Sequence, residues 1–174
     1  KSCKFYGQNP KNVNLIAVSK KFPTEAIIEA INANCKIFGE NYINEAFEKW
    51  PEIKKQHPDV KLHFIGHLQS NKAAKALEIF DCIQSLDSEK LALEFKKQIA
   101  KSENKQGTEF FIQVNIGQES QKSGIDPLKV KEFYDFAKNE CGLNVTGLMC
   151  IPPNSSFLRQ ESLLDKSEEE LPSR

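Results

Sequence analysis

The sequence predicts an α/β fold of parallel strands and helices, a TIM-type (β/α)8 barrel of which about six of the eight units are present. Six apolar segments alternate with five amphipathic ones, and successive strands begin about 21 to 35 residues apart, which leaves room for a crossover helix each time. The turn after the first strand contains no glycine, whereas a doubly wound nucleotide-binding sheet normally carries a glycine-rich turn there. The barrel is therefore favoured over the doubly wound sheet.

The first unit is the segment "LIAVSK" at residues 15–20, followed by "PTEAIIEAINANC" at residues 23–35. The unbroken apolar run from Leu15 to Val18 suits a parallel strand that is covered on both faces. In the second segment Pro23 suits the first turn of a helix, and the apolar residues that follow recur at helical spacing. The pair predicts a strand followed by a helix.

The next three units repeat this order of strand and helix. The predicted strands are residues 36–42, 61–66 and 82–87, and the helices that follow them carry, in turn, Ile43, Ala46, Phe47 and Trp50; Ala73, Leu77 and Phe80; and Leu91, Phe95 and Ile99.

A fifth strand at residues 109–117 precedes a helix with both ends marked in the sequence. Asp126 is the predicted N-cap, Pro127 takes the first helical position and Gly142 follows the last turn. A sixth strand is predicted at residues 144–152. Residues 1–153 are thus assigned to an incomplete barrel domain. Residues 154–174 contain no β-rich run and end in a charged segment, which predicts a polar tail that is disordered or lies outside the barrel.

Composition excludes several classes of function. Lys+Arg and Asp+Glu both total 24, so the formal charge is zero and nothing favours binding to nucleic acid or to an anionic membrane. No apolar run approaches the roughly 20 residues of a membrane-spanning helix. The five cysteines are widely spaced and form no C-x-x-C pair, which argues against a disulfide framework and a zinc site and favours the cytoplasm. We expect a cytoplasmic monomer with a small-molecule partner.

The end of the first strand holds the candidate nucleophile. If Ile16 and Val18 point into the barrel, strand alternation places Lys20 inward too, while Lys21 points away. An amine at the barrel mouth would be partly desolvated, which lowers its pKa and favours attack on a carbonyl, so Lys20 is the better Schiff-base candidate. The alternative is that both lysines are a polar exit from the strand, facing water.

Polar residues also follow the other predicted strands, as expected for a site built at the C-terminal ends of barrel strands. Each has a structural alternative: Asn41 could cap the second helix, and His63 could be a hydrogen-bonded core residue. No phosphate-binding loop, nucleophile elbow or H-E-x-x-H motif occurs. The three histidines do not form a convincing metal set, so no metal site is predicted.

Six segments in order, "LIAVSK", "FGENYINEA", "HFIGHLQSNK", "IQSLD", "QVNIGQESQKSGI" and "GLMCIPP", closely resemble the pyridoxal phosphate homeostasis protein family. The resemblance covers roughly residues 12 to 154. It implies a barrel like the N-terminal domain of alanine racemase, and pyridoxal 5'-phosphate (PLP) as cofactor, held as a Schiff base on Lys20. It also implies that Asn41 lies beside the ring, that Met149 lines the pocket and that Lys122 lies near it.

Members of this family resemble carriers and regulators of vitamin B6 rather than enzymes, so a non-catalytic role in PLP homeostasis is the first hypothesis. Two alternatives stay open: a PLP-dependent racemase-like enzyme that uses Lys20, and a truncated product with an impaired site. The family's serine-methionine-glycine-methionine-serine and arginine-isoleucine-glycine segments, which bind the cofactor phosphate in strands seven and eight, do not occur in this sequence. The resemblance therefore implies weakened PLP binding.

Overall fold

A computed structural model of the chain describes residue 7 and residues 9–101, 107–117 and 123–152. These residues form one six-stranded parallel sheet in which the strands are neighbours in chain order. The strands are β1 (Ile16–Val18), β2 (Ile37–Glu40), β3 (Lys61–Phe64), β4 (Cys82–Leu86), β5 (Glu109–Gln113) and β6 (Val145–Met149). All six predicted strands are confirmed, and the strand order has no switch point, which confirms the barrel-type arrangement over the doubly wound one.

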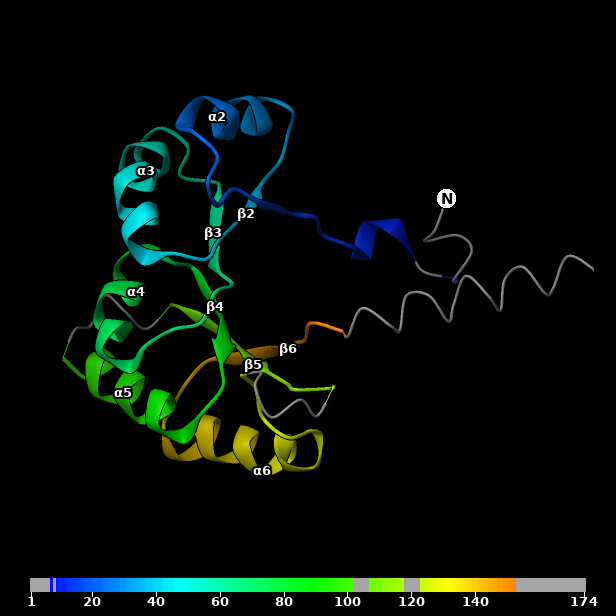
Figure 1. Ribbon diagram of the computed structural model, residues 1–174, viewed down its shortest axis with the longest axis vertical. Coiled ribbons are helices and arrows are strands. Elements are labelled where there is room, and N and C mark those ends of the chain that lie inside the picture. The colour runs from blue at the N-terminus through cyan, green and yellow to red at the C-terminus, as the bar shows by residue number, and fades with distance from the viewer. Residues whose placement is uncertain (1–6, 8, 102–106, 118–122, 153–174) are drawn as a thin grey trace, which may run out of the picture.

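The helices form a layer along one side of the sheet, in the same order as the strands (Figure 1). They are α2 (Thr24–Asn32), α3 (Ile43–Gln56), α4 (Ala73–Ile79), α5 (Glu89–Ile99) and α6 (Val130–Asp135), with shorter helical turns η1 (Pro10–Asn12), η2 (Ser70–Lys72), η4 (Pro127–Lys129) and η5 (Phe136–Glu140). None of the described helices is long and apolar enough to cross a membrane.

The core lies between the sheet and this helix layer. Phe38 of β2 packs against Trp50 of α3 with ring centroids 5.2 Å apart, and Phe110 of β5 packs against Phe95 of α5 at 4.8 Å. All four rings are almost fully buried. Burying a side chain of this size stabilises the folded state by roughly 1.5–3 kcal/mol, so these aromatic pairs fix how the helices sit on the strands.

The fifth predicted helix is confirmed at both ends but is not uniformly α-helical. Asp126 caps it by accepting a hydrogen bond of 2.9 Å from the Leu128 N–H, and Gly142 ends it at φ +69°. The first turn, η4, is a 3-10 helix, and η5 is wider because the Cys141 N–H donates to the Phe136 carbonyl five residues back.

The prediction that the first strand is covered on both faces is wrong. Leu15 is 77% exposed and Val18 44% exposed, although Ile16 and Ala17 are half-buried. The reason lies in the sheet: within the described part of the chain, β1 pairs only with β2 and β6 only with β5. The sheet is curved but not closed, so the inward face of β1 stays accessible to solvent.

Candidate functional site

Residues at the C-terminal ends of β2, β3, β5 and β6 line a cavity of about 270 Å³. Its polar side chains are three carboxamides, one hydroxyl and one imidazole. The lining residues are Asn41, Ile65, Gly66, His67, Gln113, Val114, Asn115, Ser123 and Ile151. A cavity of this kind can hydrogen-bond an aromatic heterocycle or a hydroxyl group without placing a full charge beside it.

Asn41, which directly follows β2, is the predicted site residue that the structure places in this cavity. Its side-chain oxygen Oδ1 is buried and has no hydrogen-bond partner among the described residues. The alternative that Asn41 caps the second predicted helix is wrong. Tyr42 holds the N-cap position of that helix, α3, and there is no side-chain hydrogen bond at this cap. A buried acceptor without a partner costs about 1–3 kcal/mol.

Gly66 explains why Asn41 sits where it does. A Cβ built on Gly66 would lie 2.3 Å from the Asn41 carbonyl oxygen and 2.8 Å from its Cα, so only glycine allows this contact. Gly39 of β2 is also closely packed, but against side chains: a Cβ there would lie 2.9 Å from the Ile65 side chain and 3.2 Å from that of Ile16.

Lys20 lies in a turn immediately after β1, at the same end of the sheet, and is exposed. The expected partial desolvation of its amine is wrong for this structure, because the inward face of β1 is open. Lys21 lies in the same turn and is exposed as well, so burial does not separate the two lysines as the alternation argument expects. Ser19, between β1 and the turn, is 5% exposed and its hydroxyl is hydrogen-bonded to Gly39 and Glu40 of β2. Lys20 and Met149 are not among the residues that line the 270 Å³ cavity.

Met149 ends β6 and is half-buried, with its carbonyl accepting a hydrogen bond of 2.8 Å from the Val114 N–H. Lys122 lies outside the described residues. The loop that contains it returns to the sheet at its far end: the Ile125 N–H donates to the Gln113 carbonyl at 2.8 Å. Ser123, the next residue after Lys122, lines the cavity, so this loop ends at the site.

Two histidines near the site have different surroundings. His63 of β3 is bonded through Nδ1 to Gln84 Nε2 at 2.8 Å, and burial lowers its pKa. The prediction of a hydrogen-bonded histidine is confirmed, although His63 is half-buried and lies outside the core. His67 Nδ1 lies 3.2 Å from Ser123 Oγ and 3.7 Å from Asp87 Oδ2. Burial raises the pKa of Asp87 even though His67 opposes the rise. Among the described residues, no group of three or more metal-binding side chains is placed to hold an ion.

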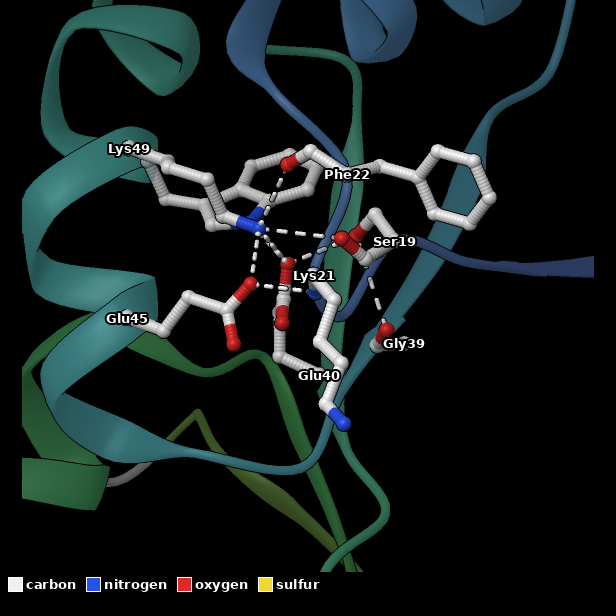
Figure 2. A network of polar contacts seen from close by, with 8 residues as sticks. Ser19, Lys21, Phe22, Gly39, Glu40, Glu45 and Lys49 are labelled. Atoms are coloured by element: carbon white, nitrogen blue, oxygen red, sulfur yellow. Dashed lines mark hydrogen bonds and ion pairs between the residues drawn. The ribbon is translucent and has the colours of Figure 1, made fainter.

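Sequence reasoning missed a buried polar network at the end of β1 (Figure 2). Glu40 is fully buried, and its Oε1 contacts Lys49 Nζ at 2.7 Å, Ser19 Oγ at 2.8 Å and Trp50 Nε1 at 3.2 Å. Lys49 also bonds Glu45 Oε1 at 2.9 Å. One signal could have found it: Glu45 and Lys49 stand four residues apart on a predicted helix, a spacing at which opposite charges pair.

The fold and the site define the class of protein, a parallel β/α-barrel protein with a lysine at the C-terminal end of its first strand. The family described as alanine racemase, N-terminal domain, matches residues 7–170. The chain is 40% identical to the pyridoxal phosphate homeostasis protein of Vibrio cholerae and 39% identical to that of Haemophilus influenzae, over 85% and 95% of its length. It belongs to the pyridoxal phosphate homeostasis protein family.

The chain spans 63% of the length of the Vibrio relative and 69% of the Haemophilus one. Two solved structures of PipY from Synechococcus elongatus, one without PLP and one with PLP bound, are similar to it at 34% identity. Their TM-scores are 0.76 and 0.72, and the likeness covers 96% of this chain and 77% and 76% of theirs. The predicted family and the alanine racemase-like fold are therefore confirmed.

Proposed function

We propose that this chain binds PLP, with Lys20 as the residue that reacts with the cofactor aldehyde, and serves vitamin B6 homeostasis without catalysing a reaction. The observation that carries the proposal is the position of Lys20 at the same sheet end as the cavity that Asn41 lines. Supporting it, a relative at 34% identity has been solved with PLP bound.

Binding PLP requires an amine that can react with its aldehyde and a group that can hydrogen-bond its pyridine ring. The neutral amine of Lys20 would condense with the PLP aldehyde, which would form one C=N bond and release one water molecule. Asn41 would hydrogen-bond the ring from the side of β2, and Met149 would line the pocket from β6. When bound, PLP supplies the electron-withdrawing ring and the aldehyde; the protein residues hold and orient it. Lys122 is proposed as a further residue near the pocket.

A spectroscopic titration tests the proposal. Adding PLP to the wild type should give a saturable long-wavelength absorbance band that disappears in Lys20→Ala and persists in Lys21→Ala, the matched control one residue away. Identical spectra for wild type and Lys20→Ala would overturn the assignment of Lys20. An assay of amino-acid racemisation by the PLP-loaded protein tests the non-catalytic part, which sustained turnover would contradict.

A further inference from the structure

The turn that carries Lys20 has a defined and unusual backbone. Ser19 and Phe22 close it, because the Phe22 N–H donates to the Ser19 carbonyl at 3.1 Å. Lys20 and Lys21 occupy the two central positions, and Lys21 adopts φ +64°, a left-handed conformation that residues other than glycine rarely take. The surroundings must stabilise such a conformation if it is to persist.

Two side chains of α3 supply that stabilisation. Lys49 Nζ donates to the carbonyls at both ends of the turn, Ser19 O at 2.9 Å and Phe22 O at 3.3 Å. Glu45 Oε1 accepts the N–H of Lys21, the left-handed residue, and also binds Lys49. Figure 2 shows both α3 side chains reaching the turn from the same helix. The backbone on each side of Lys20 is thus tied to α3.

The network is itself anchored in the core. Glu40, at the end of β2, is fully buried and binds Lys49 at 2.7 Å. The same Glu40 oxygen accepts hydrogen bonds from Ser19 Oγ and from the buried Trp50. The turn, β2 and α3 are therefore joined through one carboxylate that cannot move without disturbing the core.

We propose that Glu45 and Lys49 are positioning residues that fix the backbone of Lys20 and so set how readily its amine reacts with PLP; this rests on the proposed function. The Lys20 side chain is exposed, so a fixed backbone is what limits where its amine can go. When the reaction requires one backbone conformation, a residue whose backbone is free must first be ordered, which costs conformational entropy. Releasing the turn should therefore slow the reaction on the order of tenfold, which corresponds to about 1.4 kcal/mol.

Glu45→Ala is the cleaner test, because Lys49 keeps Glu40 as its partner and no buried charge is left alone. The chain offers a matched control in Asp81, a carboxylate that also binds one lysine of α3, Lys54 at 2.8 Å, and one backbone N–H, that of Leu62 at 2.7 Å. Asp81 precedes β4 and so lies at the opposite end of the sheet. Asp81→Ala removes the same two kinds of bond away from the turn, together with a longer ion pair of 3.8 Å to the exposed Lys61.

The experiment measures the initial rate of the Lys20-dependent absorbance change after mixing each protein with PLP. We expect Glu45→Ala to be slower than wild type on the order of tenfold, Asp81→Ala to stay close to wild type, and Glu45→Gln, whose amide oxygen can still accept the Lys21 N–H, to recover most of the rate. Equal slowing in Glu45→Ala and Asp81→Ala would show a general effect of stability and overturn the inference.

Amide hydrogen exchange of the wild type adds a test that needs no variant. The N–H groups of Lys21 and Phe22 should exchange slowly although the turn is on the surface, and rapid exchange would contradict the inference. The two proposals fail differently. A wild type without a Lys20-dependent band overturns the proposed function, whereas a normal band with an unchanged rate in Glu45→Ala overturns the positioning role alone.

Discussion

Replacing Lys49 with methionine should destabilise the protein more than any other single loss of a lysine charge in the described part of the chain. The side chains of Lys49 and Glu40 are 11% and 0% exposed, and their charged atoms lie 2.7 Å apart. Methionine fills similar space but leaves Glu40 as a buried carboxylate without a counter-charge. Breaking a buried ion pair in this way costs about 3–5 kcal/mol. Small domains are stable by about 5–15 kcal/mol, so this is a large share.

Urea denaturation measures this loss, followed by fluorescence of Trp50, the one tryptophan in the chain, and by circular dichroism. With a denaturant slope of about 2 kcal/mol per molar urea, the midpoint should fall by roughly 2 M. The double variant Glu40→Gln/Lys49→Met should regain about 2 kcal/mol relative to the sum of the single changes, since it removes the stranded charge.

Lys54→Met is the control on the same helix. Lys54 pairs with Asp81 at 2.8 Å, but both side chains are about one-quarter exposed. Solvent weakens such a pair, and we expect a loss of about 1 kcal/mol. A loss of stability in Lys49→Met no larger than that in Lys54→Met would contradict the stabilising role of the buried ion pair. So would effects of the Glu40 and Lys49 changes that simply add.

Three further predictions concern other parts of the chain. Gly66→Ala should destabilise by about 1–3 kcal/mol in thermal unfolding, because the added Cβ meets the Asn41 backbone; an unchanged midpoint would contradict the close contact. Burial raises the pKa of Cys82 to about 12, so alkylation at neutral pH should label the exposed Cys150 and spare Cys82 until unfolding; equal labelling would be the contrary result. Burial would raise the pKa of Glu45, but its cationic neighbours and hydrogen bonds outweigh this and lower it. Its stabilisation should therefore be complete above the unfolded pKa, about 4.3, and disappear as pH falls through the lower folded value, so the stability deficit of Glu45→Gln should vanish in acid.

The fold could be predicted from the sequence because each strand and helix buries apolar side chains between the sheet and the helix layer, and this burial sets the spacing of its apolar residues. Trp50 and Phe95 stand at helical spacing from their apolar neighbours, and both pack where the pattern predicts. Asp126 and Gly142 mark their helix through local backbone chemistry, which needs no tertiary information. The exposure of β1 could not be predicted in the same way. The apolar run "LIAV" shows that the strand is able to be buried on both faces, but how much of it is exposed depends on which strands pair with it.

The candidate site was only partly accessible to sequence reasoning. Asn41 reaches the cavity because barrel topology brings all strand ends to one side, and that topology was predicted. Lys49 was missed because its role depends on Glu40, which comes from another element and is buried only in the folded chain. Pairing across elements has no fixed spacing in the sequence, so only the i,i+4 pair with Glu45 was visible in principle.

The central claim is that Lys20, and not simply any exposed lysine, is the residue that holds PLP. Borohydride reduction of the PLP-treated wild type, followed by peptide mapping, tests it most directly, because reduction makes the bond to lysine permanent. Lys21 is the internal comparison, with the same side chain one residue away. We expect Lys20 to carry most of the label at limiting PLP. Equal labelling of Lys20 and Lys21 would show ordinary surface chemistry and contradict the proposed role of Lys20.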